Sequence, residues 1–263
     1  MRVARPAGAP LLQVRGLGKR YGGKVALDDV SFTVAAGEFV ALLGPSGAGK
    51  TTLFRCLTRL VESDSGEIIL GGRALHVARG HHLREIRRGT GLIFQQFNLV
   101  RRLTALENVL AGRLGHAPTW RVLLRRFSHA DRQLALASLD QVGLLAYAAQ
   151  RADRLSGGQQ QRVAIARVLA QRSSLVLADE PVASLDPESA ANVLGTLRDI
   201  AHERGIAVLC SLHQVDLATA FADRIIGLRA GRLVADLPAA RLDAAEQTRL
   251  YRTEAVPAVP LGA

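Results

Sequence analysis

The chain has few of the residues on which several classes of protein depend. Only 2 of its 263 residues are cysteines, and aromatic residues make up 4%. Two cysteines in distant apolar runs do not make the disulfide framework of a small secreted domain. We therefore expect Cys56 and Cys210 to be small buried side chains in a reducing compartment. So few aromatics leave little surface for stacking on bases, which argues against nucleic acid as a partner.

Long apolar runs are also missing. No stretch approaches the roughly 18–20 consecutive apolar residues that a membrane-spanning helix needs. The N-terminal stretch MRVARPAGAPLLQV has two arginines, but Pro6, Gly8 and Pro10 interrupt any apolar centre of a signal peptide. We therefore expect the chain to reach a membrane only through a partner.

Lysine is scarce, although the chain is strongly basic. The formal net charge is +11, and lysine stands only at positions 19, 24 and 50, so arginine supplies nearly all the positive charge. The arginines are scattered, with one local cluster at Arg121, Arg125 and Arg126. Two interpretations of this charge stay open. It reflects compositional bias, or it lets the protein contact an anionic surface such as lipid.

The apolar pattern predicts an α/β chain with one core. Short β-branched segments at 11–14, 25–27 and 31–34 predict antiparallel strands. The apolar run at 38–43 predicts a strand buried on both faces. We expect further strands, separated by helices, at 67–70, 91–94, 175–178, 207–211 and 224–228. Residues 103–154 lack a convincing strand and predict a helical insertion, and residues 237–263 predict a C-terminal helix with a Pro/Ala tail.

A glycine-rich run between a strand and a helix predicts a phosphate-binding loop. It matches the pattern G-x-x-x-x-G-K-[ST], and it consists of Gly44, Pro45, Ser46, Gly47, Ala48, Gly49, Lys50 and Thr51. The glycines allow backbone N–H groups to face phosphate oxygens, and the next helix N-terminus adds partial positive charge. Lys50 is expected to bind the outer phosphates, the hydroxyl of Thr51 to bind Mg²⁺, and Thr52 to contact nucleotide.

Two carboxylates end the apolar strand at 175–178. Neighbouring residues of a strand point to opposite sides, so Asp179 and Glu180 are expected to have separate roles. We predict that Asp179 holds Mg²⁺ and that Glu180 polarises an attacking water. An acidic pair at a strand end is a weak signal alone, and the phosphate-binding loop is what strengthens it.

Two helix starts carry further signals. Ser156 and Gln159 have the spacing of a capping box before a helix at 160–171. Gly157 and Gly158 also leave bare N–H groups that can face an anion, so the residues alone leave both roles open. Asp186, followed by a proline, is predicted to cap a second helix.

Three single residues are weak signals when taken alone. Tyr21 stands in a Lys-Arg-Tyr-Gly-Gly turn, where a surface aromatic is the plainer interpretation. Gln95 follows a strand end, where a neutral amide can bridge to a metal-bound water. His213 ends an apolar strand, where a histidine is commonly an ordinary edge residue.

Together, these pieces over residues 11–236 resemble the ATP-binding cassette (ABC) family. The resemblance implies an α/β P-loop NTPase fold with a parallel core sheet, an N-terminal antiparallel β-subdomain and an inserted helical subdomain. It implies ATP with Mg²⁺ as ligands. It assigns adenine stacking to Tyr21, the Walker A loop to Gly44–Thr51, the Q-loop glutamine to Gln95, the signature to Ser156, Gly157, Gly158 and Gln159, the Walker B pair to Asp179 and Glu180, the D-loop to Ser184 and Asp186, and the switch histidine to His213.

The resemblance also implies partners. In this family two cassettes pair head to tail, and the signature of one copy closes over ATP held by the other. Hydrolysis of ATP requires charge stabilisation on several sides of the γ-phosphate, which one loop does not supply. We therefore expect a second copy of this chain, integral-membrane permease subunits, a periplasmic or lipid-anchored solute-binding protein, and a place on the cytoplasmic face of the cell inner membrane.

Less universal segments resemble phosphonate-import ATPases. They are IFQQFNLV from Ile93, LENVLAGRLG from Leu106 with Trp120, SLHQVD from Ser211, and the insertion near Pro118–Phe127. Import of another anion or an amino acid, efflux, a soluble cassette ATPase acting on DNA or ribosomes, and a P-loop kinase are the alternatives. The resemblance places a groove for the permease's coupling helix at Phe97, Leu99 and the apolar face of Leu106–Leu110, where ordinary core packing is the alternative.

Overall fold

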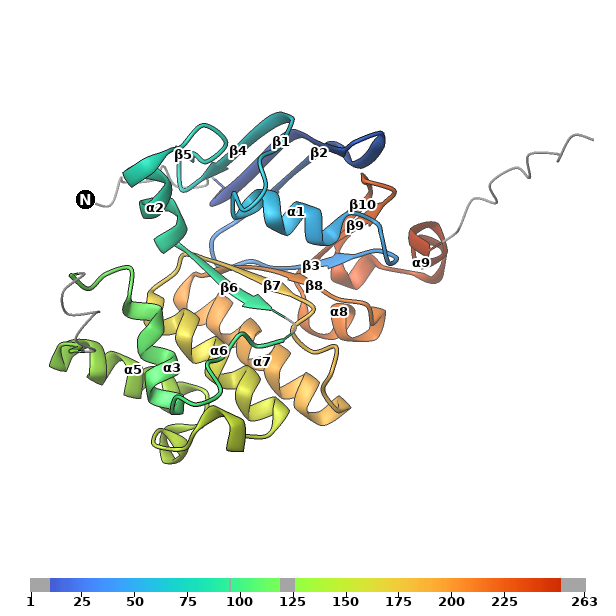
Figure 1. Ribbon diagram of the computed structural model, residues 1–263. Helices are drawn as coiled ribbons and strands as arrows, with labels where there is room; N and C mark the ends of the chain where they lie inside the picture. Colours follow the sequence, from blue (N-terminus) through green and yellow to red (C-terminus); the bar gives the residue numbers. More distant parts are fainter. Residues whose placement is uncertain (1–9, 95, 119–125, 252–263) are drawn as a thin grey trace, which may run out of the picture.

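The fold is that of a computed structural model, which describes residues 10–94, 96–118 and 126–251. Two sheets form its framework (Figure 1). The smaller sheet has the strand order β2-β1-β4-β5 and is antiparallel, as the N-terminal pattern predicted. Its strands are β1 (Leu12–Tyr21), β2 (Lys24–Val34), β4 (Ser65–Leu70) and β5 (Arg73–Ala74).

Strand β2 corrects the prediction of two separate strands at 25–27 and 31–34. The polar pair Asp28 and Asp29 interrupts the apolar pattern but not the pairing with β1. Asp29 adopts a positive φ of 53°, and the ladder shifts register between the pairs Leu17–Val30 and Lys19–Leu27. The extra residue is thus absorbed as a β-bulge, which keeps one continuous strand.

The larger sheet holds six strands in the order β10-β9-β3-β8-β7-β6. Strands β9, β3, β8, β7 and β6 run parallel, and β10 pairs antiparallel with β9. The parallel core sheet is therefore as expected from the sequence. Its strands are β3 (Phe39–Leu43), β6 (Thr90–Phe94), β7 (Leu175–Asp179), β8 (Ala207–Ser211), β9 (Arg224–Arg229) and β10 (Arg232–Pro238).

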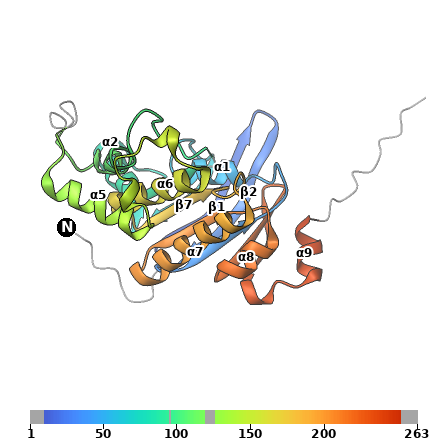
Figure 2. The same ribbon diagram turned by 90° about the horizontal axis from the view of Figure 1, so that it is seen from below.

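Helices cover both faces of this larger sheet. Alternate residues of β3 show the division, because Phe39 and Ala41 join one buried cluster whereas Val40 and Leu42 join another. The second cluster lies with α1 and the smaller sheet, and the first lies with α6, α7 and α8 (Figures 1 and 2). The helices are α1 (Lys50–Leu57), α2 (Gly80–Arg88), α6 (Gly157–Gln171), α7 (Pro187–Arg204) and α8 (Val215–Phe221).

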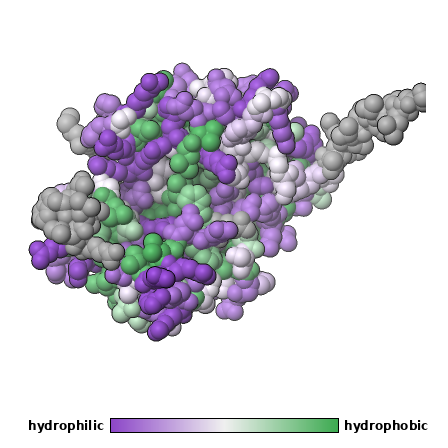
Figure 3. All heavy atoms as spheres, viewed as in Figure 1, coloured by the Kyte–Doolittle hydropathy of each residue, from purple (hydrophilic) through white to green (hydrophobic). Residues whose placement is uncertain are grey.

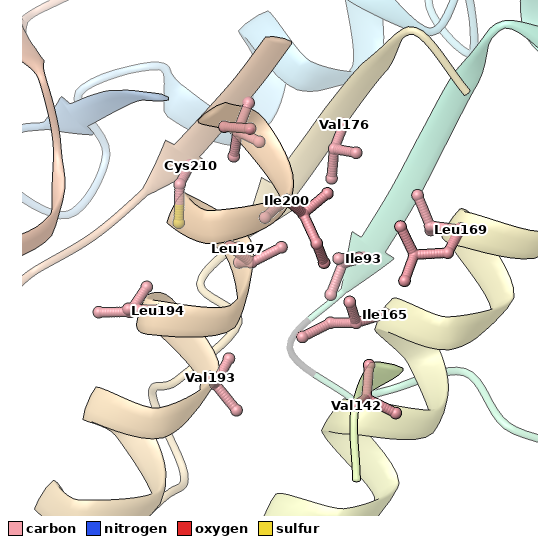
Figure 4. Close-up of a cluster of buried hydrophobic side chains, with 14 of the residues drawn as sticks. Ile93, Val142, Ile165, Leu169, Val176, Val193, Leu194, Leu197, Ile200 and Cys210 are labelled. Carbon is pink, nitrogen blue, oxygen red and sulfur yellow. The ribbon is translucent and has the colours of Figure 1, made fainter. Parts of the chain in front are cut away.

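Interdigitated aliphatic side chains hold α6 and α7 to the sheet (Figure 4). Ile165 and Leu169 of α6 and Leu197 of α7 are each less than 5% exposed. They pack in one cluster with Val176 of β7 and Ile93 of β6. Burial of a side chain of this size contributes about 1.5–3 kcal/mol each. The two helix N-termini are therefore fixed relative to the strand ends.

A helical lobe follows β6, as the missing strand pattern of residues 103–154 indicated. It contains α3 (Ala105–Leu110) and α5 (His129–Gln141), with short 3₁₀ turns, and both helices pack on α6. Val109 and Leu110 are only 0% and 4% exposed. These two residues therefore belong to the lobe core, and the predicted groove cannot use them.

The helix after the phosphate-binding loop is shorter than its leucine spacing suggested. It ends at Leu57, because Arg59 takes a φ of 57° and sends its guanidinium to the carbonyls of Leu75 and His76. Leu60 consequently lies outside the helix and is 62% exposed. The sequence pattern also gave no sign of α2.

The C-terminal part of the described chain returns to the larger sheet. The expected domain boundary at residue 236 falls inside β10, which the sequence pattern did not indicate. Helix α9 (Ala244–Tyr251) then places the fully buried Leu250 against Gly227 of β9. Among the described residues, no helix combines the length and the apolar character required to traverse a lipid bilayer. Both cysteines are buried and free, as predicted.

Candidate nucleotide-binding site

The predicted phosphate-binding loop connects β3 to α1 at the carboxyl end of the parallel strands. Its first and last glycines have no room for a side chain. A Cβ atom at Gly44 would lie 2.1 Å from the carbonyl oxygen of Leu228, and one at Gly49 would lie 2.5 Å from that of Ala26. Gly49 also has a φ of 109°, which only glycine adopts readily. The loop is therefore held tightly against its neighbours, with the remaining backbone free to surround an anion.

Lys50 lies within this loop and is 5% exposed. Its Nζ atom donates to the carbonyl oxygens of Gly44, at 2.6 Å, and Pro45, at 3.3 Å. Burial lowers the pKa of Lys50, and the carboxylates of Glu180 and Asp179 act in the opposite direction. The ammonium is therefore stabilised electrostatically by these two carboxylates, and phosphate oxygens in the loop would supply further negative charge.

One serine hydroxyl organises the two carboxylate residues. Ser211 Oγ donates to Asp179 Oδ1 at 2.8 Å and accepts the backbone N–H of Glu180 at 2.8 Å. This is possible because Asp179 and Ser211 are direct partners in the parallel ladder of β7 and β8. Burial raises the pKa of Asp179, and the Ser211 hydrogen bond opposes that effect. The sequence analysis did not identify Ser211, although its place at a neighbouring strand end was a usable signal.

Glu180 and His213 form a pair at the same edge of the sheet. His213 Nε2 lies 2.6 Å from Glu180 Oε1, so the two predicted residues are brought together. Glu180 has a φ of 51°, a left-handed conformation that costs a non-glycine residue about 1–2 kcal/mol. The turn that follows, with Ala183 N–H donating to the Glu180 carbonyl, holds the residue there.

The predicted signature residues begin α6, and the helix starts at Gly157, three residues before the predicted start at 160. Ser156 and Gln159 form a complete capping box, so that part of the prediction is confirmed. Ser156 and Gly157 are nevertheless exposed. No hydrogen bond between described residues joins 156–159 to the loop at 44–52. The signature of one chain thus forms no hydrogen bond with the phosphate-binding loop of the same chain among the described residues.

Asp186 caps α7 through its carboxylate, which accepts the backbone N–H of Ser189 at 2.9 Å. That backbone hydrogen bond lowers the pKa of Asp186. Ser184 is exposed in the turn between Glu180 and α7, two residues before this cap. The D-loop residues therefore lie on the turn that connects Glu180 to α7.

Among the other predicted residues, Tyr21 is described by the structure and Gln95 is not. Tyr21 is 46% exposed at the end of β1, and Lys19 Nζ lies 5.6 Å from its ring centre. An exposed ring at this place can stack on a planar ligand. Gln95 lies outside the described residues, as do Trp120, Arg121 and Arg125. The proposed role of Gln95 stays a prediction.

Arg167 of α6 anchors the described segment that follows residue 95. Its guanidinium donates to the carbonyl oxygens of Asn98, at 2.7 Å, and Phe97, at 3.1 Å. Phe97 and Asn98 both have positive φ angles, 55° and 48°, so their backbone needs such support. The sequence analysis missed Arg167, because nothing in its local pattern separates it from neighbouring arginines.

A cleft extends from Asp179 and Glu180 along β6, where Leu92 and Phe94 line it. A cavity of about 360 Å³ beside Thr51, Asp179 and Glu180 continues into a second of about 430 Å³. Both are lined by Leu60 and Phe94. We call these two cavities the apolar cleft. Figure 3 shows hydrophobic surface across the middle of this face.

Comparison with known proteins agrees with this arrangement. A family model described as ABC transporter matches residues 27–183, which is more than half of the chain. The chain is 55% identical to a hypophosphite import ATP-binding protein of Stutzerimonas stutzeri, over 86% of this chain and 66% of that protein. It is 54% identical to a phosphonates import ATP-binding protein of Frankia casuarinae, over 88% of this chain and 92% of that protein.

Solved structures share the fold. A dimeric bacterial ABC transporter cassette superposes with a TM-score of 0.73 and 33% identity, covering 87% of this chain and 98% of that one. A post-hydrolysis form of that cassette, bound to ADP and inorganic phosphate, gives the same values. A putative metal-chelate type ABC transporter in an inward-facing conformation gives 0.78 and 27%, covering 92% and 89%. The chain therefore belongs to the ABC transporter family.

Proposed function

We propose that this chain is the ATP-hydrolysing, energy-coupling subunit of an ABC importer. The observation that carries the proposal is the grouping of Lys50, Asp179, Glu180 and His213 at the carboxyl edge of one parallel sheet. A glycine-cradled cation beside two carboxylates suits binding and hydrolysis of a nucleoside triphosphate. The ATP-binding relatives and the cassette bound to ADP support ATP as the nucleotide.

The oxygen donors present fit Mg²⁺. The hydroxyl of Thr51 and the carboxylate of Asp179 line the same cavity. No group of three or more His, Cys, Asp or Glu suited to a metal occurs among the described residues. Mg²⁺ is commonly held by one or two protein ligands, with phosphates and waters completing its shell, so this donor set is adequate. When bound, the ion would neutralise charge on the phosphates.

Glu180 is the proposed water-activating residue. Its carboxylate accepts hydrogen bonds when ionised, and His213 holds one of its oxygens at 2.6 Å. That contact fixes the carboxylate relative to the phosphate-binding loop, while the second oxygen stays available to orient a water. His213 itself is exposed and can face the outer phosphate.

We propose that the complete site requires a second copy. Ser156 and Gly157 are exposed at a helix N-terminus, and in the described structure they form no hydrogen bond with the phosphate-binding loop of their own chain. The partial positive charge of that helix end suits the γ-phosphate held by a partner. The dimeric form of the cassette relative supports this pairing.

The apolar cleft is the proposed seat of a permease segment. Leu60 is 62% exposed there and lines both cavities together with Leu92 and Phe94, and a hollow lined by several apolar side chains suits a partner segment. Of the residues predicted for this groove, Phe97 and Leu99 line a neighbouring cavity of about 650 Å³ with Ser184. We therefore replace Val109 and Leu110 by Leu60 and Phe94 in the proposed contact. Docking there would place the chain at the cytoplasmic face of the inner membrane.

Phosphonates or a related phosphorus oxyanion are the proposed cargo, carried through separate permease and solute-binding subunits. Support comes from the names of the relatives, since none of the site residues described above would contact a transported solute. Growth of a deletion strain on methylphosphonate or hypophosphite, compared with phosphate, tests the cargo. Restored growth with the wild-type gene but not with a Glu180→Gln gene is the expected result, and unimpaired growth of the deletion strain on both compounds would refute the assignment.

The ATPase itself is tested with purified protein. Glu180→Gln keeps the shape of the side chain but removes its negative charge, so it should bind ATP and stop hydrolysis. Glu203→Gln, at an exposed position of α7, is the matched control and should hydrolyse ATP at the wild-type rate. Normal hydrolysis by Glu180→Gln would show that another residue activates the water.

A further inference from the structure

A strongly basic cavity lies beyond the far end of the apolar cleft. It measures about 500 Å³ and lies between α2, the segment after α3, and α6. We call it the basic cavity, and it includes Arg84, Arg87, Arg88, His116 and Arg167. Figure 1 shows α2 and the segment after α3 on the same side of the molecule. It shares Arg87, Arg167 and Gln171 with the apolar cleft, and none of its lining residues is predicted to bind nucleotide.

No carboxylate balances this charge in the described structure. The cavity is lined by no Asp or Glu, and Arg84, Arg87, Arg88 and Arg167 form no ion pair with any described residue. Glu85, which follows Arg84 in the sequence, pairs with Arg73, and Asp131, whose charge acts on His116, pairs with Arg113. Four arginines therefore line one cavity without a carboxylate among its lining residues, and the resulting positive potential favours an anion there.

Two of the four arginines are held in place by the backbone. Arg87 donates to the carbonyl oxygens of Thr58, at 3.2 Å, and Arg59, at 3.0 Å. Arg167 is half-buried and donates to the carbonyls of Phe97 and Asn98. Burial lowers the pKa of Arg167, with no carboxylate acting against it. Such anchoring reduces the entropy lost when a ligand binds, because these side chains are already ordered.

The other two arginines are free to adjust. Arg84 and Arg88 are exposed on successive turns of α2 and make no side-chain hydrogen bond with a described residue. The opposite wall is close, since a Cβ atom at Gly115 would lie 3.2 Å from Arg88 Cγ. His116 stands on that wall, where burial, Arg113 and Arg88 lower its pKa. His116 thus adds an imidazole to the cavity wall, close to the positive charges of Arg113 and Arg88.

We propose that the basic cavity binds a tetrahedral oxyanion, either a free phosphate or phosphonate or the phosphate group of a lipid. Guanidinium groups form paired, charge-assisted hydrogen bonds with such oxygens, and fixed and mobile arginines together can surround one. Arg167 also holds the backbone of Phe97 and Asn98, and Asn98 lines the apolar cleft together with Asp179 and Glu180. An anion bound to Arg167 would therefore contact the side chain that supports this segment.

The test uses the purified full chain with Mg²⁺ and a saturating non-hydrolysable ATP analogue, which fills the phosphate-binding loop. Inorganic phosphate and methylphosphonate are titrated by calorimetry at constant ionic strength. One additional anion should bind per chain. Arg84→Gln/Arg88→Gln should weaken that binding about tenfold per arginine, since a hydrogen bond to a charged group is commonly worth a tenfold change or more.

The matched control is Arg204→Gln/Arg241→Gln, which removes the same charge from exposed positions on α7 and the turn before α9. It should bind phosphate as the wild type does. Equal loss in both double variants would overturn the inference, because bulk charge would then explain the binding.

Vesicles distinguish the two sources of the anion. Phosphatidylcholine vesicles with and without phosphatidic acid are sedimented with each variant. Binding that requires phosphatidic acid and Arg84/Arg88, with no free-phosphate site, would assign the cavity to a lipid headgroup. Free-phosphate binding that vesicles do not displace would assign it to a soluble anion. If neither phosphate binding nor vesicle binding changes in Arg84→Gln/Arg88→Gln, the proposed site is refuted. Neither measurement depends on ATP hydrolysis, so this outcome is separate from a failure of the proposed function.

Discussion

At the scale of single residues, the candidate site depends on one hydroxyl that serves two carboxylate positions. Ser211 is fully buried and contacts both the Asp179 side chain and the Glu180 backbone N–H. A buried donor that loses its partner costs about 1–3 kcal/mol. The residue therefore links the geometry of the proposed metal ligand, Asp179, to that of the proposed water-activating residue, Glu180.

Ser211→Ala should slow ATP hydrolysis more than it weakens ATP binding. The change removes support for Asp179 and leaves the Glu180 N–H unpaired, whereas the loop at 44–51 is untouched. Steady-state kinetics and nucleotide titration measure the two effects separately. Ser174→Ala, at an exposed serine immediately before β7, is the control. A variant that loses ATP binding and hydrolysis equally would show that Ser211 acts only through stability.

The two cysteines allow a chemical test of burial. Both are 0% exposed, and burial raises the pKa of Cys56 to about 11 and raises that of Cys210 further. The thiolate is the reactive form, and raising the pKa makes it rarer at any pH below that value. At pH 8 a disulfide reagent should therefore leave both thiols unmodified in the native chain and modify both in urea. Rapid modification of the native protein would show that the core around β8 or α1 opens.

At the scale of elements, the residues that cap helices were predicted best. Ser156 and Asp186 were recognised as caps, and both cap as expected. The missed features depend on contacts made elsewhere in the chain. Strand β2 continues through Asp28 because β1 pairs with it, and α1 stops at Leu57 because Arg59 bonds to distant carbonyls. Local patterns carry no record of such partners.

Helix α9 should matter for stability although it lies beyond the family match, which ends at residue 183. Leu250 is 0% exposed and packs on Gly227, so Leu250→Ala should lower the free energy of unfolding by about 2–5 kcal/mol. Leu60→Ala, at a 62% exposed position, should change it by about 0.5 kcal/mol or less. Denaturant unfolding measures both. Similar losses for the two variants would mean that α9 is not docked in solution.

At the scale of the whole molecule, the family and the fold followed from the motifs, and the comparisons confirm both. The sequence could also place Lys50, Asp179, Glu180 and His213 at one sheet edge, because parallel strands end together. It could not place the basic cavity. Arg84, Arg88 and His116 lie far from Arg167 in the sequence. Only the packing of α2 and the lobe on α6 brings these residues to one cavity.

A mixing experiment tests whether the working unit is a pair of chains. Lys50→Ala disables the phosphate-binding loop, and Ser156→Arg obstructs the signature end of α6. A mixed head-to-tail dimer has one site that carries both changes and one that carries neither. Mixtures should therefore recover part of the ATPase activity that each variant lacks alone. No recovery would contradict the paired arrangement, provided that an untagged copy of one variant co-purifies with a tagged copy of the other.

At Glu180, the left-handed backbone favours one kind of residue for stability, and the proposed chemistry favours another. Glycine or asparagine would relieve that φ of 51°, so a library of variants sorted for thermal stability alone should drift toward those residues at position 180. The same library sorted for transport should hold glutamate. Sequencing both populations would then show that thermal stability and transport activity favour different residues at this position, without any kinetic assay.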